Sequence, residues 1–104
     1  MNEKELEKEI TDKGLNAPRL TPEDIDRVIK EEYYYRQPDT TLTICILILQ
    51  NGFIVTGESA AASIENFDRE IGEKIAKGNA REKIWQLEGY LLKDKLFRGV
   101  LNEK

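Results

Sequence analysis

Residues 41–49 read TLTICILIL and are followed, after one glutamine, by Asn51-Gly52. β-Branched and other aliphatic residues in such a run are typical of a β-strand. Asn-Gly is the preferred pair for a two-residue hairpin turn. Residues 53–56, FIVT, are therefore predicted to pair back on the first strand until Gly57 and Ser59 end the pairing. This stretch predicts an antiparallel hairpin.

Aliphatic side chains occupy both faces of the first predicted strand. The even positions, which are Leu42, Ile44, Ile46 and Ile48, lie on one face. The odd positions, which are Cys45, Leu47 and Leu49, lie on the other. A strand in a half-exposed sheet alternates apolar and polar residues, so both faces of this strand need a cover. The helices of the chain can cover one face, and a second copy of the chain would cover the other. The pattern therefore predicts self-association.

A short helix is predicted before the strands. Thr21, Pro22 and the acids that follow them form a typical helix start, which predicts a helix over residues 22–31. Residues 1–20 are rich in Glu and Lys and have little apolar surface to bury, so they are expected to be a charged, flexible arm. Residues 21–104 are expected to form a single α+β domain.

A helical region is predicted after the hairpin. Either Ser63 or Asn66 can cap its start, and Gly99 is expected to be its C-cap. Gly78-Asn79 interrupts its apolar stripe, which favours two helices or one kinked helix. With the extended residues 33–35, YYY, the fold class is α+β: a short N-terminal helix, an antiparallel two- or three-stranded sheet and a C-terminal helical region, assembled as an oligomer.

Composition excludes several classes of function. The net charge of −4 disfavours a general binder of nucleic acid polymers or membrane surfaces. The chain has no histidine and one cysteine, Cys45, which excludes histidine-dependent hydrolases, multi-thiolate metal sites and intrachain disulfides. Residues 44–49, the longest apolar run, are too short to cross a bilayer, and the charged N-terminus does not resemble a signal peptide. The expectation is an intracellular protein that is not an enzyme and needs no cofactor.

Some residues fit a binding role, although the sequence favours a structural role for each of them. Phe67 at a helix start could stack on a purine or be the first core residue, and Glu58 could read a hydroxyl or cap a turn. Residues 33–36, YYYR, could stack on bases or form a strand with one buried tyrosine. Cations are spread over the helical region and could bind phosphates or only face solvent: Lys77, Arg81, Lys83, Lys93 and Lys95.

A distinctive string of short motifs runs through residues 40–97. It comprises Asn51-Gly52-Phe53, Gly57-Glu58-Ser59, Glu65-Asn66-Phe67-Asp68, Gly72, Asn79-Ala80 and the block KIWQLEGYLL at residues 83–92. This string resembles a family of small tailed-phage proteins that includes the Thoeris anti-defence signal sponges. The block at residues 83–92 is its most specific part.

The resemblance implies a function without catalysis. Such proteins sequester cyclic ADP-ribose isomers made by bacterial TIR-domain proteins in the cytoplasm of the host, and some relatives also hold cyclic di- or trinucleotides at separate sites. They work as dimers that can assemble into hexamers, with pockets at subunit boundaries. Nucleic acid polymers and membranes are not expected partners.

The resemblance also implies site residues. Phe67 would be the stacking partner of the adenine, and Asn79 would donate side-chain hydrogen bonds. Lys83 and Glu58 are further candidate ligand contacts. The family commonly has an arginine for phosphate contact shortly after the Gly-Tyr pair at residues 89–90.

This sequence departs from the family at that arginine. Lys93 and Lys95 stand in the stretch instead. Lysine cannot make the planar, two-pronged phosphate contact of arginine, so the departure leaves the phosphate site and the choice of ligand open.

Two other functions remain compatible with the sequence. Residues 1–40 carry 7 basic and 11 acidic side chains, a balance of 7 − 11 = −4, so the acidic half could make this a phage adaptor that inhibits a host protein by direct binding. A small oligomeric scaffold without a ligand is the other.

Overall fold

The structure is a computed structural model and describes residues 2–99 of the chain. The elements follow the order α1 (Glu3–Asp12), α2 (Pro22–Val28), β1 (Ile29–Arg36), β2 (Leu42–Leu49), β3 (Ile54–Ala60), the 3-10 helix η1 (Ile64–Asn66) and α3 (Arg69–Phe97). The chain divides into two compact units. One is residues 28–84, which hold the sheet and the first half of α3, and the other comprises, among the described residues, 2–27 and 85–99.

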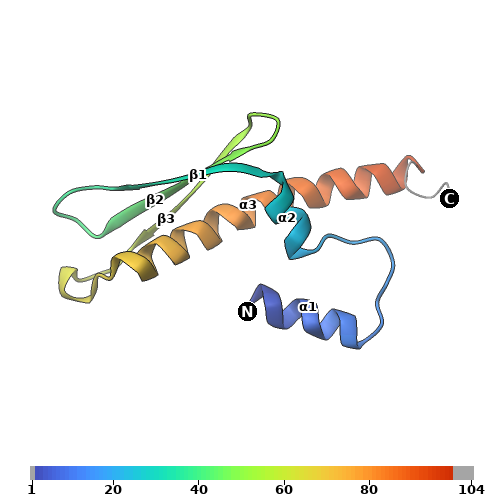
Figure 1. Cartoon of the computed structure of the whole chain (residues 1–104), viewed down its shortest axis with the longest axis horizontal. Coiled ribbons are helices and arrows are strands. Elements are labelled where there is room, and N and C mark those ends of the chain that lie inside the picture. Colours follow the sequence, from blue (N-terminus) through green and yellow to red (C-terminus); the bar gives the residue numbers. More distant parts are fainter. Residues whose placement is uncertain (1, 100–104) are drawn as a thin grey trace. The chain divides into compact units, whose positions relative to one another are not determined.

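The three strands form one antiparallel sheet in the order β1-β2-β3 (Figure 1). Its register places Tyr34 opposite Cys45 and Cys45 opposite Gly57. The predicted α+β class is confirmed, with three strands. The third strand arises because extended structure begins at Ile29 and shortens the helix that was predicted over residues 22–31.

The predicted hairpin is present, but its turn is longer than the two residues expected. The Gly52 amide donates to the Leu49 carbonyl at 2.8 Å, so Gln50 and Asn51 are the central residues. Gly52 follows them with φ of 91°, in the left-handed region that favours glycine. The Leu49 amide then donates to the Phe53 carbonyl, also at 2.8 Å, and closes a three-residue loop with a glycine bulge.

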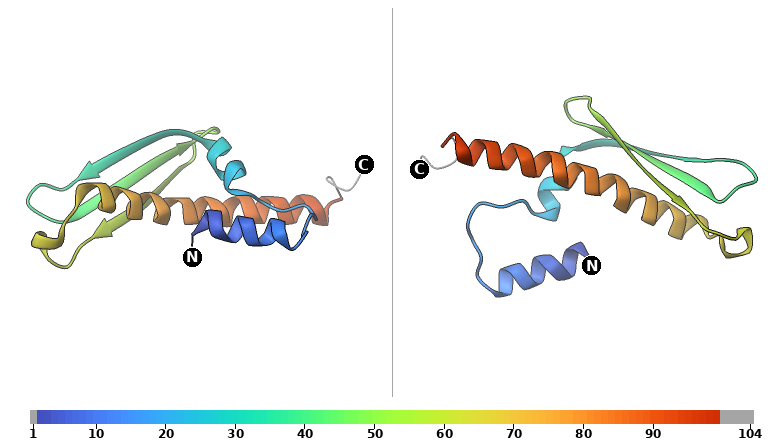
Figure 2. Two further views of the ribbon diagram at one scale, coloured as in Figure 1. Left: turned by 60° about the horizontal axis from the view of Figure 1, so that its bottom comes forward. Right: turned by 180° about the vertical axis from the view of Figure 1, so that it is seen from behind.

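The first half of α3 runs along one face of the sheet (Figure 2). Small buried residues four positions apart let the helix backbone come close to the sheet: Gly72 lies against Thr43 of β2, and Ala76 and Ala80 lie against Gly57 of β3. A Cβ atom at Gly57 would collide with the backbone of Ala76 and Ala80. Gly57 therefore does not end the strand as predicted, because it provides the space for the helix, and β3 continues to Ala60.

The core lies between α3 and the odd positions of β2. Thr43, Cys45, Leu47 and Leu49 are buried on that face, together with Val55 of β3. The opposite face of the sheet has no cover from the described residues of this unit. It displays the half-buried or exposed side chains of Tyr33, Tyr35, Leu42, Ile44, Ile46, Ile48 and Ile54, here called the open face.

α3 is one helix of 29 residues and has no break at residues 78–79. Its N-cap is Asp68, and not Ser63 or Asn66, the two caps predicted from the sequence. The Asp68 carboxylate accepts a hydrogen bond from the Ile71 amide at 3.0 Å. Ser63 caps η1 instead of α3. Gly99 follows the last helical residue after one intervening residue, Arg98, and has φ of 79°, as expected for its predicted C-cap role. In the described part of the chain, no helix is long and apolar enough to cross a membrane.

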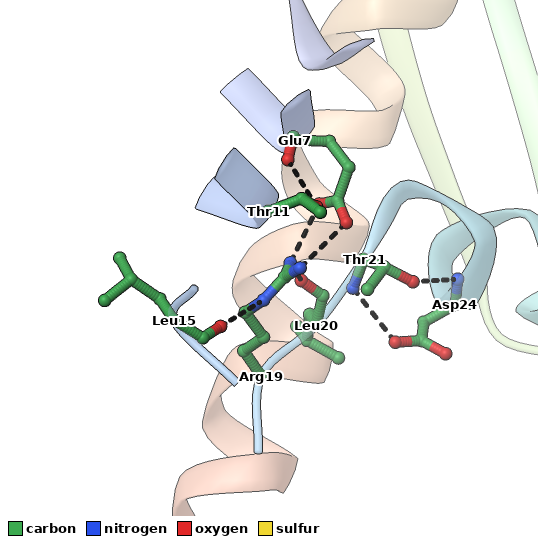
Figure 3. Close-up of polar contacts among 7 residues, drawn as sticks. All are labelled: Glu7, Thr11, Leu15, Arg19, Leu20, Thr21 and Asp24. Atoms are coloured by element: carbon green, nitrogen blue, oxygen red, sulfur yellow. Dashed lines mark hydrogen bonds and ion pairs between the residues drawn. The ribbon is translucent and has the colours of Figure 1, made fainter. Parts of the chain in front are cut away.

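The other unit is held by polar contacts of its N-terminal segment. Arg19 makes a two-pronged ion pair with Glu7 of α1, with both N···O distances at 2.8 Å (Figure 3). Thr21 and Asp24 exchange hydrogen bonds and cap α2, as the sequence predicts for a helix start. The Trp85 indole donates to Glu3 at 3.0 Å. The flexibility expected for residues 1–20 stays a prediction. The structure forms α1 within this stretch of the chain.

Candidate functional site

Phe67 stands at the centre of the candidate site. It lies between η1 and α3, as the C-cap of η1, and its side chain is half-buried. Beside it is a cavity of about 330 Å³, within the range of small-ligand sites. The cavity is lined by Tyr34, Tyr35, Arg36, Thr43, Phe67, Arg69 and Glu73.

Arg36, at the end of β1, covers the Phe67 ring. Its guanidinium carbon lies 4.2 Å from the ring centroid, a cation–π contact. One terminal nitrogen of Arg36 donates to the Thr40 carbonyl at 2.8 Å. The contact occupies one face of the ring that was expected to stack on a base, so a base on that face would have to displace or cover the guanidinium.

Arg69, the first residue of α3, supplies a second cation. Its Nε atom donates to the Glu73 carboxylate at 3.2 Å, and 80% of its side chain is exposed. The remaining N–H groups of an exposed arginine can turn to a ligand at little cost. The start of the helix adds partial positive charge, although the Asp68 carboxylate already occupies part of that end.

Thr43, on β2, is the buried polar group of the cavity. Thr43 is 1% exposed. Among the residues that the structure describes, its hydroxyl is the one buried side-chain polar group that lacks a hydrogen-bond partner. Such a group costs about 1–3 kcal/mol relative to a satisfied one. Its neighbour across the strand pair is Arg36, and Gly72 leaves space next to the hydroxyl.

A second, smaller cavity also uses Phe67. Its volume is about 110 Å³. It is lined by Ser59, Ala60, Ala61, Asn66, Phe67, Asp68, Ile71, Gly72 and Ile75. The ring of Phe67 thus belongs to a polar, cationic cavity and to a mainly apolar one. A molecule with a flat ring and an anionic group would find both kinds of surface here.

One lining residue of the larger cavity, Tyr34, belongs to a satisfied polar cluster. The Tyr34 hydroxyl donates to Glu32 at 2.6 Å, and Lys77 pairs with the same carboxylate at 3.1 Å. Burial and the bond to Glu32 raise the pKa of Tyr34, while the Tyr34 bond and Lys77 lower the pKa of Glu32. Burial raises the pKa of the Cys45 thiol, so the thiol is protonated and unreactive at neutral pH.

Two of the predicted site residues are brought together by the fold. The Asn79 side-chain amide of α3 donates to the backbone carbonyl of Glu58 in β3 at 2.8 Å. Both side chains are exposed, and Glu58 lies on the open face of the sheet opposite Ile44. One N–H of the Asn79 amide therefore has a structural partner, and its second N–H and its oxygen are left for the ligand contact predicted from the resemblance.

The three predicted lysines lie elsewhere on α3. Lys83 is exposed and does not line the cavities around Phe67. Lys93 and Lys95 are exposed near the C-terminal end of the helix and belong to the other unit. Their roles in binding phosphate stay predictions.

Phe67 is the one lining residue of the larger cavity among the predicted site residues, and the other six were missed. Arg36 was visible as the cation after three tyrosines, and Thr43 as the polar residue among the odd positions of β2. No sequence signal marked Arg69, because charged residues are common in the first turn of a helix. No group of three potential metal ligands occurs in the part of the chain that the structure describes.

The family comparison agrees with the phage assignment. The model of the Phage protein (N4 Gp49/phage Sf6 gene 66) family matches residues 20–96, which include the whole sheet and nearly all of α3. No curated protein and no solved structure matches the chain. Since the match covers most of the chain, with every residue of the cavity around Phe67 inside it, this chain belongs to the N4 Gp49/phage Sf6 gene 66 family of phage proteins.

Proposed function

We propose that this phage protein binds and sequesters cyclic nucleotide immune signals without cleaving them. The leading ligands are cyclic ADP-ribose isomers made by TIR-domain proteins, and cyclic di- or trinucleotides are a second class to test. The observation that carries the proposal is the cavity beside Phe67, where an aromatic ring meets two arginines. An aromatic surface suits a base, and arginines suit its phosphates.

The proposal needs recognition and no chemistry. The residues that line the larger cavity include cations, hydroxyls and one carboxylate, Glu73, which is paired with Arg69. Neither Tyr34 nor Cys45 is ionised at neutral pH, because the pKa of each is raised. A tight site of this composition would hold its ligand unchanged.

The proposal includes a homodimer, with a hexamer as a possible larger assembly. The open face of the sheet supports it, because aliphatic and tyrosine side chains from all three strands lie there together. A second copy of the same chain could cover this surface with its own open face. Ile46 lies centrally on it, between Tyr33 and Thr56.

The test uses each cyclic ADP-ribose isomer separately with the purified protein. After removal of free ligand, heat is used to release bound molecules for mass spectrometry. Recovery of the intact isomer supports sequestration, and recovery of a linear product would contradict it. The same protein is also melted with each ligand, because binding to the folded state alone raises the Tm. Absence of both recovery and Tm shift with all cyclic nucleotides would overturn the proposal.

Two phenylalanine variants give the matched control. Phe67→Ala should abolish the Tm shift, because it removes the ring from both cavities. Phe53→Ala removes an equally large ring that is 54% exposed in the hairpin and outside these cavities, so it should leave ligand binding unchanged. Melting curves without ligand show whether Phe67→Ala still folds. If it unfolds, Phe67→Leu keeps apolar bulk without the aromatic face and provides the decisive measurement.

A further inference from the structure

The floor of the larger cavity has a polar group that the fold leaves unused, and the kind of molecule that would bind there rests on the proposed function. The residue Thr43 lines the cavity together with Arg36 and Arg69 of the same unit, and its buried hydroxyl has no hydrogen-bond partner among the described residues. Valine has the same shape as threonine and would fill this buried position without a polar group. A purely structural role therefore does not account for the hydroxyl.

The rim of the cavity has cations that come from separate elements. Arg36 lies at the end of β1 and Arg69 at the start of α3, and each uses one of its nitrogens in the contacts described above. Other guanidinium N–H groups remain available, since arginine has several donors in a fixed planar arrangement. Glu73 offsets part of this charge, and with two arginines and one carboxylate the lining has a balance of 2 − 1 = +1.

We propose that this cavity is an anion subsite that binds a phosphate group of the nucleotide, with Arg36 and Arg69 on its rim and the Thr43 hydroxyl donating from its floor. The pyrophosphate of a cyclic ADP-ribose isomer has the required chemistry. Two arginines match its two negative charges, and the Phe67 ring lies next to them for the attached base or ribose. This subsite differs from the stretch of Lys93 and Lys95.

The hydroxyl is tested by a pair of substitutions at Thr43. Thr43→Val removes the hydroxyl and keeps the volume, whereas Thr43→Ser keeps the hydroxyl. The probes are inorganic pyrophosphate, followed by ³¹P NMR, and a cyclic ADP-ribose isomer, followed by calorimetry. Thr43→Val should weaken binding of each by about tenfold, and Thr43→Ser should stay close to the natural protein. Because no partner is lost in the free protein, Thr43→Val should melt at the same or a higher temperature without ligand.

The cations are tested with a charge-matched control. Arg36→Gln and Arg69→Gln should each weaken pyrophosphate binding by about tenfold or more. Lys74→Gln removes a charge from the same part of α3 at an exposed side chain that does not line the cavity, so it should bind like the natural protein. Equal weakening in all three variants would indicate general charge attraction and would overturn the subsite.

The outcomes separate this inference from the proposed function. If the cyclic ADP-ribose isomer binds and Thr43→Val, Arg36→Gln and Arg69→Gln bind it equally well, the subsite is wrong and sequestration stands. If pyrophosphate binding depends on these residues but no cyclic nucleotide binds, the subsite stands and sequestration is wrong. If the natural protein binds neither probe, both are wrong.

Discussion

Gly57 of β3 lies directly against the backbone of Ala80 in α3, so close that no side chain can stand between the strand and the helix. This contact sets the distance between the sheet and the helix that together form the cavity. It also explains why a glycine occurs in the middle of a continuous strand, where it otherwise weakens pairing.

Gly57→Ala should therefore destabilise the protein strongly. The added Cβ meets backbone atoms, which cannot move aside as the end of a side chain can, so we expect a loss of about 1–3 kcal/mol or more in the free energy of unfolding. Urea denaturation followed by circular dichroism measures it.

Gly78→Ala is the matched control for that experiment. Gly78 lies within α3 with nothing near the position of its missing Cβ, so alanine should stabilise the helix by about 0.5–1 kcal/mol. Equal effects of the two substitutions would contradict the close approach at Gly57.

Asn79→Ala should remove a side-chain hydrogen bond between α3 and β3. Loss of the 2.8 Å bond to the Glu58 carbonyl should lower the free energy of unfolding by about 1 kcal/mol, less any gain in helix propensity. Gln86→Ala, at another exposed position of α3, should change stability by less than about 0.5 kcal/mol. If Asn79→Ala is neutral for stability but weakens ligand binding, the predicted ligand contact outweighs the structural one.

Ile46→Lys should produce a folded monomer if the open face is the dimer interface. A lysine there would bury a charge between two copies, yet in a single chain its ammonium group can reach solvent. Light scattering after gel filtration gives the mass, and the melting curve shows that the variant folds. A variant that remains fully assembled would rule out the open face as the interface.

Leu47→Lys, on the other face of the same strand, should behave differently. Leu47 is fully buried in the core, so a lysine there should unfold the unit instead of dissociating it. The pair of substitutions thus separates the covered face from the open one.

The ion pair between Glu7 and Arg19 should make the N-terminal helix sensitive to acid. The Arg19 bond lowers the pKa of Glu7 in the folded protein. The ion pair therefore contributes its full stability at pH values above the usual pKa range of glutamate. This contribution is lost as the pH falls through the lowered pKa of Glu7. The protection of α1 amides from hydrogen exchange should be greater in the natural protein than in Glu7→Gln at neutral pH, and the difference should vanish in acid.

A control and a second signal accompany that measurement. Glu5→Gln changes an exposed carboxylate on the same helix and should leave the protection of α1 unchanged. Trp85, the single tryptophan of the chain, donates to Glu3, so its emission should shift to longer wavelength when α1 is released. Equal protection in Glu5→Gln and Glu7→Gln would contradict the role of the ion pair.

Local sequence pattern determined the strands, the hairpin and the class of the fold. The aliphatic run at residues 41–49, the Asn-Gly pair and the helix start at Thr21 are each set by neighbours within a few positions. The same string of motifs identified the chain as a phage protein, which the family comparison confirms. The ends of elements were less predictable, because Gly57 and Gly78, which usually interrupt such elements, are accommodated by packing and by helix continuity.

Only the tertiary structure decided which residues share a site. Arg36, Thr43, Phe67 and Arg69 come from β1, β2, the segment before α3, and α3 itself. They meet because the strand register and the Gly57 contact place α3 across the sheet. The same packing gave Asn79 a backbone partner and left the Thr43 hydroxyl without one. Periodicity assigns a side chain to a face, but the distance between two such faces depends on backbone contacts far apart in sequence.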